Sequence, residues 1–261
     1  MFVKRLAVAA IFALSSLGCS TLNSSRPSVQ DRLRPNIAQR DKTPAEIYAE
    51  ADYLAYIELD IEVTDTEGNV EERKGWLSGA LIYRASEYYI LTAGHITQTG
   101  GKIIKISAYL KNGVGPEEVE ILGVDKDLDA AILKFKNPYF TFSGRVARLG
   151  NSSKLNVGDQ VVALGTPLGI RDALSVGWVM SLLSDDPRFT QSSLIIHQAP
   201  INRGNSGGPL LNMRGEVVGI NVMFLYDNRV WVSYPMSIAV PIDDIKRILP
   251  ELISGNKRVN N

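Results

Sequence analysis

The feature that most constrains the fold is a long series of short segments in which apolar and polar residues alternate. In the segment 57–63 the odd positions are apolar and the even positions are acidic. This period of two is typical of a β-strand with one buried face. Similar segments recur in two sets of about six, with short turns that contain Gly or Asn. The other predicted strands are 76–83, 88–91, 102–110, 119–124 and 130–135, then 160–165, 174–182, 194–198, 208–211, 216–222, 230–234 and 237–240.

Two sets of short strands predict an all-β domain built from two antiparallel barrels or sandwiches. The 261 residues, 45% of them hydrophobic, are enough to bury a sizeable core. Thr43, Pro44 and Glu46 form the pattern of a capping box at the start of a short helix. A helical apolar face begins at Ile242 and closes the domain, and Pro250 is expected to end that helix.

The first residues of the chain are typical of an export signal. A basic start at Lys4 and Arg5 precedes the apolar stretch 6–14, which is shorter than the roughly 20 residues that cross a membrane. The ending Leu-Gly-Cys resembles the bacterial lipoprotein signal. The resemblance implies a signal peptide at 1–18 and a lipid on Cys19, which would anchor the protein to a membrane. An ordinary signal peptide with an incidental cysteine is the alternative.

Composition excludes several other classes of protein. Lys plus Arg equals Asp plus Glu, at 28 each, so no basic surplus draws the chain to nucleic acid. A single cysteine rules out an internal disulfide. With only two histidines beside it, a zinc site would have to rest on carboxylates, and we expect no metal. The polar segment 19–42 is interpreted as a flexible tether between the membrane and the domain.

The segment 204–209, Gly-Asn-Ser-Gly-Gly-Pro, places a serine in a glycine-rich loop ahead of a strand. A serine hydroxyl is a weak nucleophile that needs a base, together with donors for the developing oxyanion. Glycine on both sides of Ser206 allows unusual dihedral angles and a close approach of a substrate carbonyl. In such a loop the amides of Gly204 and Ser206 can converge on one point. A glycine-rich turn without chemistry is the alternative.

The stretch 198–221 resembles the nucleophile region of the trypsin-like serine peptidases, most closely their HtrA (Deg) branch. Supporting likeness extends from about Trp76 to Ile248. The resemblance implies two six-stranded antiparallel β-barrels of the chymotrypsin-like fold, with a short N-terminal helix and a C-terminal helix. It also implies that Ser206 is the nucleophile and that the Gly204 and Ser206 amides form the oxyanion hole. The expected domain spans 43–255, with barrels at about 53–140 and 141–241 and a closing helix at 242–253.

Two further motifs resemble that family. A strand that ends in Thr-Ala-Gly-His resembles the family's histidine motif, which implies that His95 is the general base. His197, on the strand before the serine loop, is the alternative base. Asp129, followed by an apolar strand, resembles the family's acid, with Asp127 as the second choice. The chain order His, Asp, Ser is the chymotrypsin-like order.

Residues beside the serine loop are expected to form the primary substrate pocket. None of them is acidic, so we expect cleavage after a small or medium apolar residue rather than after Arg or Lys. Arg203 stands where the HtrA branch usually has Pro, and no PDZ domain is expected after the closing helix. The expected pocket residues are Ala199, Pro200, Ile201, Asn221, Val222 and Met223.

These expectations combine into a serine endopeptidase of exported or envelope proteins that uses a Ser-His-Asp mechanism and needs no cofactor. Its expected partners are polypeptide substrates and, through Cys19, a membrane, without nucleic acid. HtrA relatives often form trimers, so a homotrimer is a further expectation. The alternatives are a latent, membrane-anchored binding protein with the peptidase fold, and an esterase or acyl-transfer enzyme that uses the same three residues.

Overall fold

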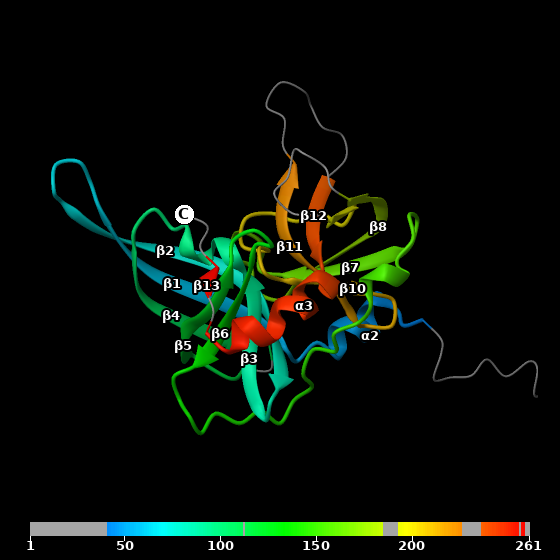
Figure 1. The fold of residues 1–261 in the computed structure, drawn as a ribbon, viewed down its shortest axis with the longest axis horizontal. Helices are drawn as coiled ribbons and strands as arrows, with labels where there is room; N and C mark the ends of the chain where they lie inside the picture. Colours follow the sequence, from blue (N-terminus) through cyan, green and yellow to red (C-terminus); the bar gives the residue numbers. More distant parts are fainter. Residues whose placement is uncertain (1–40, 112, 185–192, 226–235, 256, 259–261) are drawn as a thin grey trace, which may run out of the picture. The chain divides into compact units, whose positions relative to one another are not determined.

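The computed structural model describes residues 41–261 except 112, 185–192, 226–235, 256 and 259–261. The predicted signal peptide, Cys19, most of the tether and the predicted strand 230–234 lie outside the described residues. Residues 41–261 form one compact unit. Figure 1 shows that strands dominate it.

Six antiparallel strands form the first barrel. They pair in the order β5-β4-β1-β2-β3-β6, and a further pairing of β5 with β6 closes the barrel. A short parallel strand, β13, extends the sheet beside β5. The bounds are β1 (Leu54–Thr64), β2 (Val70–Arg84), β3 (Glu87–Ala93), β4 (Lys102–Leu110), β5 (Glu117–Asp125), β6 (Ala130–Phe135) and β13 (Lys257–Arg258).

A second closed barrel follows along the chain, with the order β10-β11-β12-β9-β8-β7. Two closed six-stranded antiparallel barrels confirm the predicted fold class. One continuous apolar core contains residues of both barrels, for example Leu81 and Ile220. The bounds are β7 (Gln160–Gly165), β8 (Ala173–Ser184), β9 (Ser193–His197), β10 (Pro209–Asn212), β11 (Val217–Leu225) and β12 (Met236–Pro241).

Helices occupy the ends of the domain. The predicted capping box is present at α2 (Pro44–Ala49), where Glu46 N–H donates to Thr43 Oγ1 and Thr43 N–H donates to Glu46 Oε2. The closing helix α3 (Ile242–Ile253) has the expected bounds 242–253 and continues past Pro250, so only the expectation that Pro250 ends it was wrong. Proline removes a single helical hydrogen bond, and burial of Leu249 and Leu252 on either side of it keeps the last turn in place.

A long hairpin of β1 and β2 extends beyond the first barrel, as the cyan ribbon in Figure 1 shows. At its tip, Asp65 Oδ1 accepts hydrogen bonds from the Glu67 and Asn69 amides at 2.8 and 2.9 Å. Gly68 has φ +89° there, which favours glycine. Strand β2 was predicted to begin at residue 76 but begins at Val70. The prediction missed residues 70–74 because they are exposed and have no apolar face.

Candidate active site

The loop that carries Ser206 connects β9 to β10 and is seated against the first barrel. The Ser206 carbonyl accepts a hydrogen bond from the Ser78 amide of β2 at 2.8 Å, and Gly207 N–H donates to Asn221 O at 2.7 Å. Gly207 has φ +84°, and a Cβ there would lie 2.1 Å from Thr92 Oγ1. Only glycine therefore allows the loop to approach the first barrel this closely.

His95 lies at the end of β3, in the single 3₁₀ turn η2 (Gly94–Thr97). Its ring Nδ1 lies 2.8 Å from Asp129 Oδ2, and its backbone N–H donates to Asp129 Oδ1 at 2.6 Å. One carboxylate thus fixes both the backbone and the ring of the histidine. The Asp129 side chain is 14% exposed and that of His95 is 32% exposed, so the pair is partly shielded from water while the ring still reaches solvent.

The turn before β6 explains how Asp129 reaches His95. Asp125 is buried and its Oδ1 accepts a hydrogen bond from the Leu128 amide at 2.9 Å, which orders the turn. Asp129 itself has φ +51°, a conformation that aspartate tolerates better than most residues. The alternative acid, Asp127, is exposed. Of the three clustered aspartates, the structure brings Asp129 to the histidine.

Ser206 and His95 line the same cleft. The Ser206 hydroxyl lies 3.5 Å from the Val222 carbonyl, and the described residues show no hydrogen bond between it and His95. Catalytic hydrogen bonds are often long without substrate and tighten when substrate binds.

Two buried hydroxyl groups hold the backbone just before Ser206. The Gly204 carbonyl accepts hydrogen bonds from Ser78 Oγ at 2.7 Å and Thr166 Oγ1 at 3.0 Å. The neighbouring Arg203 carbonyl accepts from the Leu168 amide at 2.7 Å. The backbone amides of Gly204 and Ser206, by contrast, donate to no acceptor within the part of the chain that the structure describes. Both donors are available to a ligand.

Sequence reasoning missed Ser78 and Thr166. Both side chains are fully buried, and they contact each other at 3.0 Å across 88 positions in the sequence. The available signals were a serine inside the otherwise apolar strand 76–83 and a threonine directly after β7. Neither signal shows that the two hydroxyls meet, because each comes from a different barrel.

The competing histidine, His197, is buried in the second barrel. Its Nε2 lies 3.0 Å from Asn221 Oδ1, and the Asn221 amide nitrogen donates to the Gly208 carbonyl at 3.0 Å. Burial lowers the pKa of His197 from 6.5 to about 4. The ring is therefore neutral at pH 7 and supports the hairpin behind the serine loop.

The six expected pocket residues lie in different environments. Ala199, Asn221 and Val222 are buried, whereas Pro200 and Met223 are exposed and Ile201 is half-buried. The Asn221 side chain is held by His197 and Gly208, as described above. None of the six lines the cleft beside His95 and Ser206.

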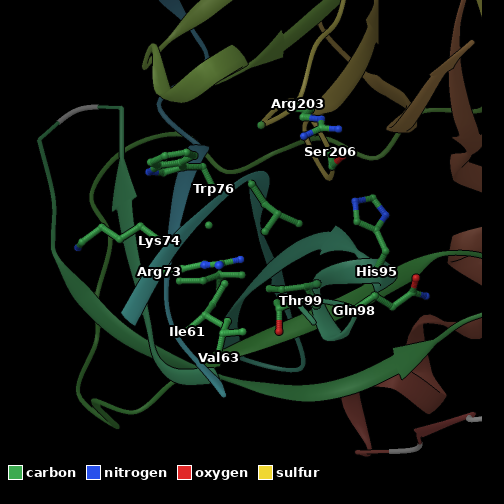
Figure 2. A pocket seen from close by; sticks show the side chains of 15 residues that line it. Ile61, Val63, Arg73, Lys74, Trp76, His95, Gln98, Thr99, Arg203 and Ser206 are labelled. Atoms are coloured by element: carbon green, nitrogen blue, oxygen red, sulfur yellow. The ribbon is translucent and has the colours of Figure 1, made fainter. Parts of the chain in front are cut away.

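That cleft has a volume of about 360 Å³ and reaches from the serine loop to the β1–β2 hairpin. Figure 2 shows Trp76 and Arg73 on the hairpin across from His95 and Ser206. Its lining contains three cationic side chains and no carboxylate. The lining residues are Leu59, Ile61, Val63, Arg73, Lys74, Gly75, Trp76, Leu77, His95, Ile96, Gln98, Thr99, Arg203, Gly204 and Ser206.

The described residues contain neither a metal-binding cluster nor a membrane-spanning helix. No group of three or more His, Cys, Asp or Glu side chains is arranged there to hold a metal ion. None of the helices in those residues is long and apolar enough to span a membrane.

Two six-stranded barrels, with a His–Asp pair on one and a glycine-flanked serine on the other, define the chymotrypsin-like class of proteins. Comparison with known families agrees with this class. The trypsin-like peptidase domain family matches residues 77–220, more than half of the chain, and the protein belongs to that family.

Individual relatives are HtrA-type proteins. The chain is 33% identical over 199 residues to Serine protease Do-like HtrA of Bacillus subtilis, covering 73% of this chain but 42% of the relative. It is 31% identical over 217 residues to Protease Do-like 5, chloroplastic, of Arabidopsis thaliana, covering 81% of this chain and 67% of the relative. The chain thus spans less than half of the Bacillus protein.

Solved structures show the same fold. The structure of the HtrA-type protease AlgW with a decapeptide matches with a TM-score of 0.66 at 22% identity, over 82% of this chain and 69% of that one. The structure of AlgW with a tripeptide matches with a TM-score of 0.64 at 24% identity, over 81% and 64%.

Proposed function

We propose that this protein is a serine endopeptidase that cleaves peptide bonds through an acyl-enzyme intermediate. The observation that carries the proposal is the 2.8 Å pairing of the His95 ring with the Asp129 carboxylate in a cleft that Ser206 also lines. Relatives named as serine proteases support it. The proposed roles are Ser206 as nucleophile, His95 as base, Asp129 as the carboxylate that orients it, and the Gly204 and Ser206 amides as oxyanion hole.

In the proposed first step, Ser206 Oγ attacks the carbonyl carbon of the peptide bond and His95 Nε2 takes the hydroxyl proton. Asp129, on the other ring nitrogen, keeps Nδ1 protonated and stabilises the imidazolium that forms. The developing oxyanion accepts hydrogen bonds from the two unengaged amides of Gly204 and Ser206. Collapse of this intermediate breaks the C–N bond, and His95 gives the proton to the departing amine.

A water molecule completes the proposed cycle. It replaces the amine in the cleft and attacks the acyl carbon, while His95 Nε2 takes one of its protons. Collapse then breaks the bond to Ser206 Oγ, and His95 returns the proton to that oxygen. The products are a carboxylic acid and the free enzyme, so no electron acceptor or metal enters the balance.

The proposed substrates are polypeptides outside the cytoplasm. Relatives from Chlamydia trachomatis and Pseudomonas putida are named probable periplasmic serine endoproteases, which supports this location.

We also propose that Cys19 carries a lipid. Metabolic labelling with a radioactive fatty acid should label the wild type and leave Cys19→Ser unlabelled, and labelling of both would reject Cys19 as the site.

The first prediction concerns the reactive serine. A fluorophosphonate probe should label the full-length wild type, and labelling should disappear in Ser206→Ala and His95→Ala. Asp129→Asn should lower the rate of peptide hydrolysis by about 10⁴-fold, since the histidine would lose its orienting carboxylate.

Asp127→Asn is the matched control for that last variant and should hydrolyse peptides at the wild-type rate. Loss of activity in Asp127→Asn with retention in Asp129→Asn would reverse the choice of acid. An unlabelled wild type would favour the binding-protein alternative. Hydrolysis of a simple ester but of no peptide would favour an esterase.

A further inference from the structure

The cleft beside Ser206 differs in charge from the chain as a whole. The chain has a formal net charge of zero, whereas the cleft is lined by three cationic side chains and by no Asp or Glu. Two of the cations, Arg73 and Lys74, lie on the β1–β2 hairpin. The third, Arg203, precedes the serine by three positions, and Figure 2 shows it close to Ser206 at the cleft.

Among the described residues, only one of these cations lacks a partner. Lys74 Nζ lies 2.7 Å from Glu58, and the Arg73 guanidinium lies 2.7 Å from Glu71. Within the described residues, by contrast, the Arg203 guanidinium forms no ion pair and no hydrogen bond. Its charge is therefore available to a ligand in the cleft.

The proposed mechanism indicates which part of the substrate lies near the Arg203 guanidinium. His95 gives its proton to the departing amine, so the segment after the cleaved bond lies on the His95 side of Ser206. The cleft extends from these two residues to the hairpin. The expected primary pocket, 199–201 and 221–223, contributes no residue to it. The cleft thus receives the leaving segment rather than the acyl segment.

We propose that Arg203 binds a carboxylate of the leaving segment and so directs cleavage to bonds that are closely followed by an acidic group. The proposal rests on the proposed endopeptidase function. A guanidinium matches a carboxylate in geometry and forms two parallel hydrogen bonds with it. Both an Asp or Glu side chain and the free C-terminus of a short peptide supply this chemistry.

The expected size of the preference follows from the exposure of Arg203. Ion pairs between exposed groups change an equilibrium or rate by roughly two- to fivefold, and salt screens them. We therefore expect a two- to fivefold gain in kcat/KM for an acidic residue over its amide counterpart. The gain should shrink as the ionic strength is raised.

The test uses the full-length protein and a mixed peptide library with amidated C-termini, with cleavage sites identified by mass spectrometry. The variants are Arg203→Gln, which removes the charge, and Arg203→Glu, which reverses it. Arg84→Gln is the matched control, since Arg84 is exposed at the end of β2 and does not line the cleft. The rate of fluorophosphonate labelling reports in parallel whether each variant keeps an assembled site.

The proposal predicts enrichment of Asp and Glu after the cleaved bond for wild type and Arg84→Gln. The enrichment should be lost in Arg203→Gln and replaced by Lys and Arg in Arg203→Glu, in proteins that still take the probe. A matched pair of peptides with free and amidated C-termini distinguishes the two carboxylate sources. A preference for the free terminus that Arg203→Gln abolishes would support the proposal and assign the source.

Two results would overturn the proposal. One is a wild type that cleaves peptides with no preference for an acidic side chain or for a free C-terminus, and the other is such a preference that Arg203→Gln retains. Both leave the endopeptidase function intact. A wild type that cleaves nothing and takes no probe would instead overturn the proposed function, and this inference with it.

Discussion

At the scale of single residues, His197 shows how a side chain outside the cleft supports the site. It is fully buried and contacts Asn221, whose backbone carbonyl accepts the Gly207 amide and whose side chain donates to Gly208. The serine loop and the ring are thus joined through one asparagine. A charged His197 would have to be accommodated in the same apolar surroundings.

This burial predicts a loss of stability in acid. Burial holds the pKa of His197 at about 4 in the folded protein, below its ordinary value of 6.5. The unfolded chain therefore binds more protons between these values, and stability falls as the pH falls from 6.5 towards 4. The loss between pH 7 and pH 5 should be about 2 kcal/mol. Urea unfolding at both pH values should show a smaller loss for His197→Gln, and an equal loss in both proteins would contradict the assignment.

The buried hydroxyl of Thr166 gives a second prediction at this scale. Thr166→Val keeps the shape of the side chain but leaves the Gly204 carbonyl with Ser78 alone. We expect a loss of about 1–2 kcal/mol of stability, the usual cost of a lost buried hydrogen bond, together with slower fluorophosphonate labelling. Thr64→Val, at the exposed end of β1, is the matched control and should change neither. Unchanged labelling in Thr166→Val would show that this hydroxyl does not position the loop.

The residues of the candidate site were predictable to different degrees. Ser206, His95 and Asp129 lie in recognisable local motifs, so each could be chosen from its neighbours in the sequence. Ser78 and Thr166 could not, because their importance depends on a contact between barrels that no local pattern records. Asp129 was separable from Asp127 only through the resemblance, since both are turn residues beside the same strand.

At the scale of elements, the bounds of a strand could be predicted from the sequence where one of its faces is buried. Strands β4, β6 and β7 were predicted with their observed bounds, because their apolar residues mark them clearly. The first residues of β2, 70–75, were missed because residues 70–74 are exposed and carry no alternating apolar face. Pro250 was misread as a helix end because local propensity was weighed without the packing of Leu249 and Leu252.

At the scale of the whole molecule, the segment between β7 and β8 of the second barrel packs against the first barrel. Its Arg171 lies over the rings of Tyr56 and Tyr109 in the first barrel, 4.2 and 4.1 Å from the ring centres. The same segment holds the Arg203 carbonyl through Leu168. The docking of the barrels and the position of the serine loop therefore share one short piece of chain.

Removing this contact should loosen the docking of the barrels. Exposed cation–π contacts contribute about 0.5–1 kcal/mol each, so Arg171→Gln should lose roughly 1–2 kcal/mol in urea unfolding. Arg171→Lys keeps the charge and should recover part of the loss. Arg145→Gln, an exposed arginine outside these ring contacts, should have little effect. A stability of Arg171→Gln equal to that of wild type would mean that the contact contributes nothing.

The close packing of Gly207 against Thr92 has a consequence for when the site is assembled during folding. A ribosome releases the first barrel, with His95 and Asp129, well before it reaches Ser206. Until the second half has folded and its serine loop lies against the first barrel, His95 and Ser206 are apart. Under the proposed function, the chain therefore gains the ability to cleave peptide bonds only when both barrels have folded and docked.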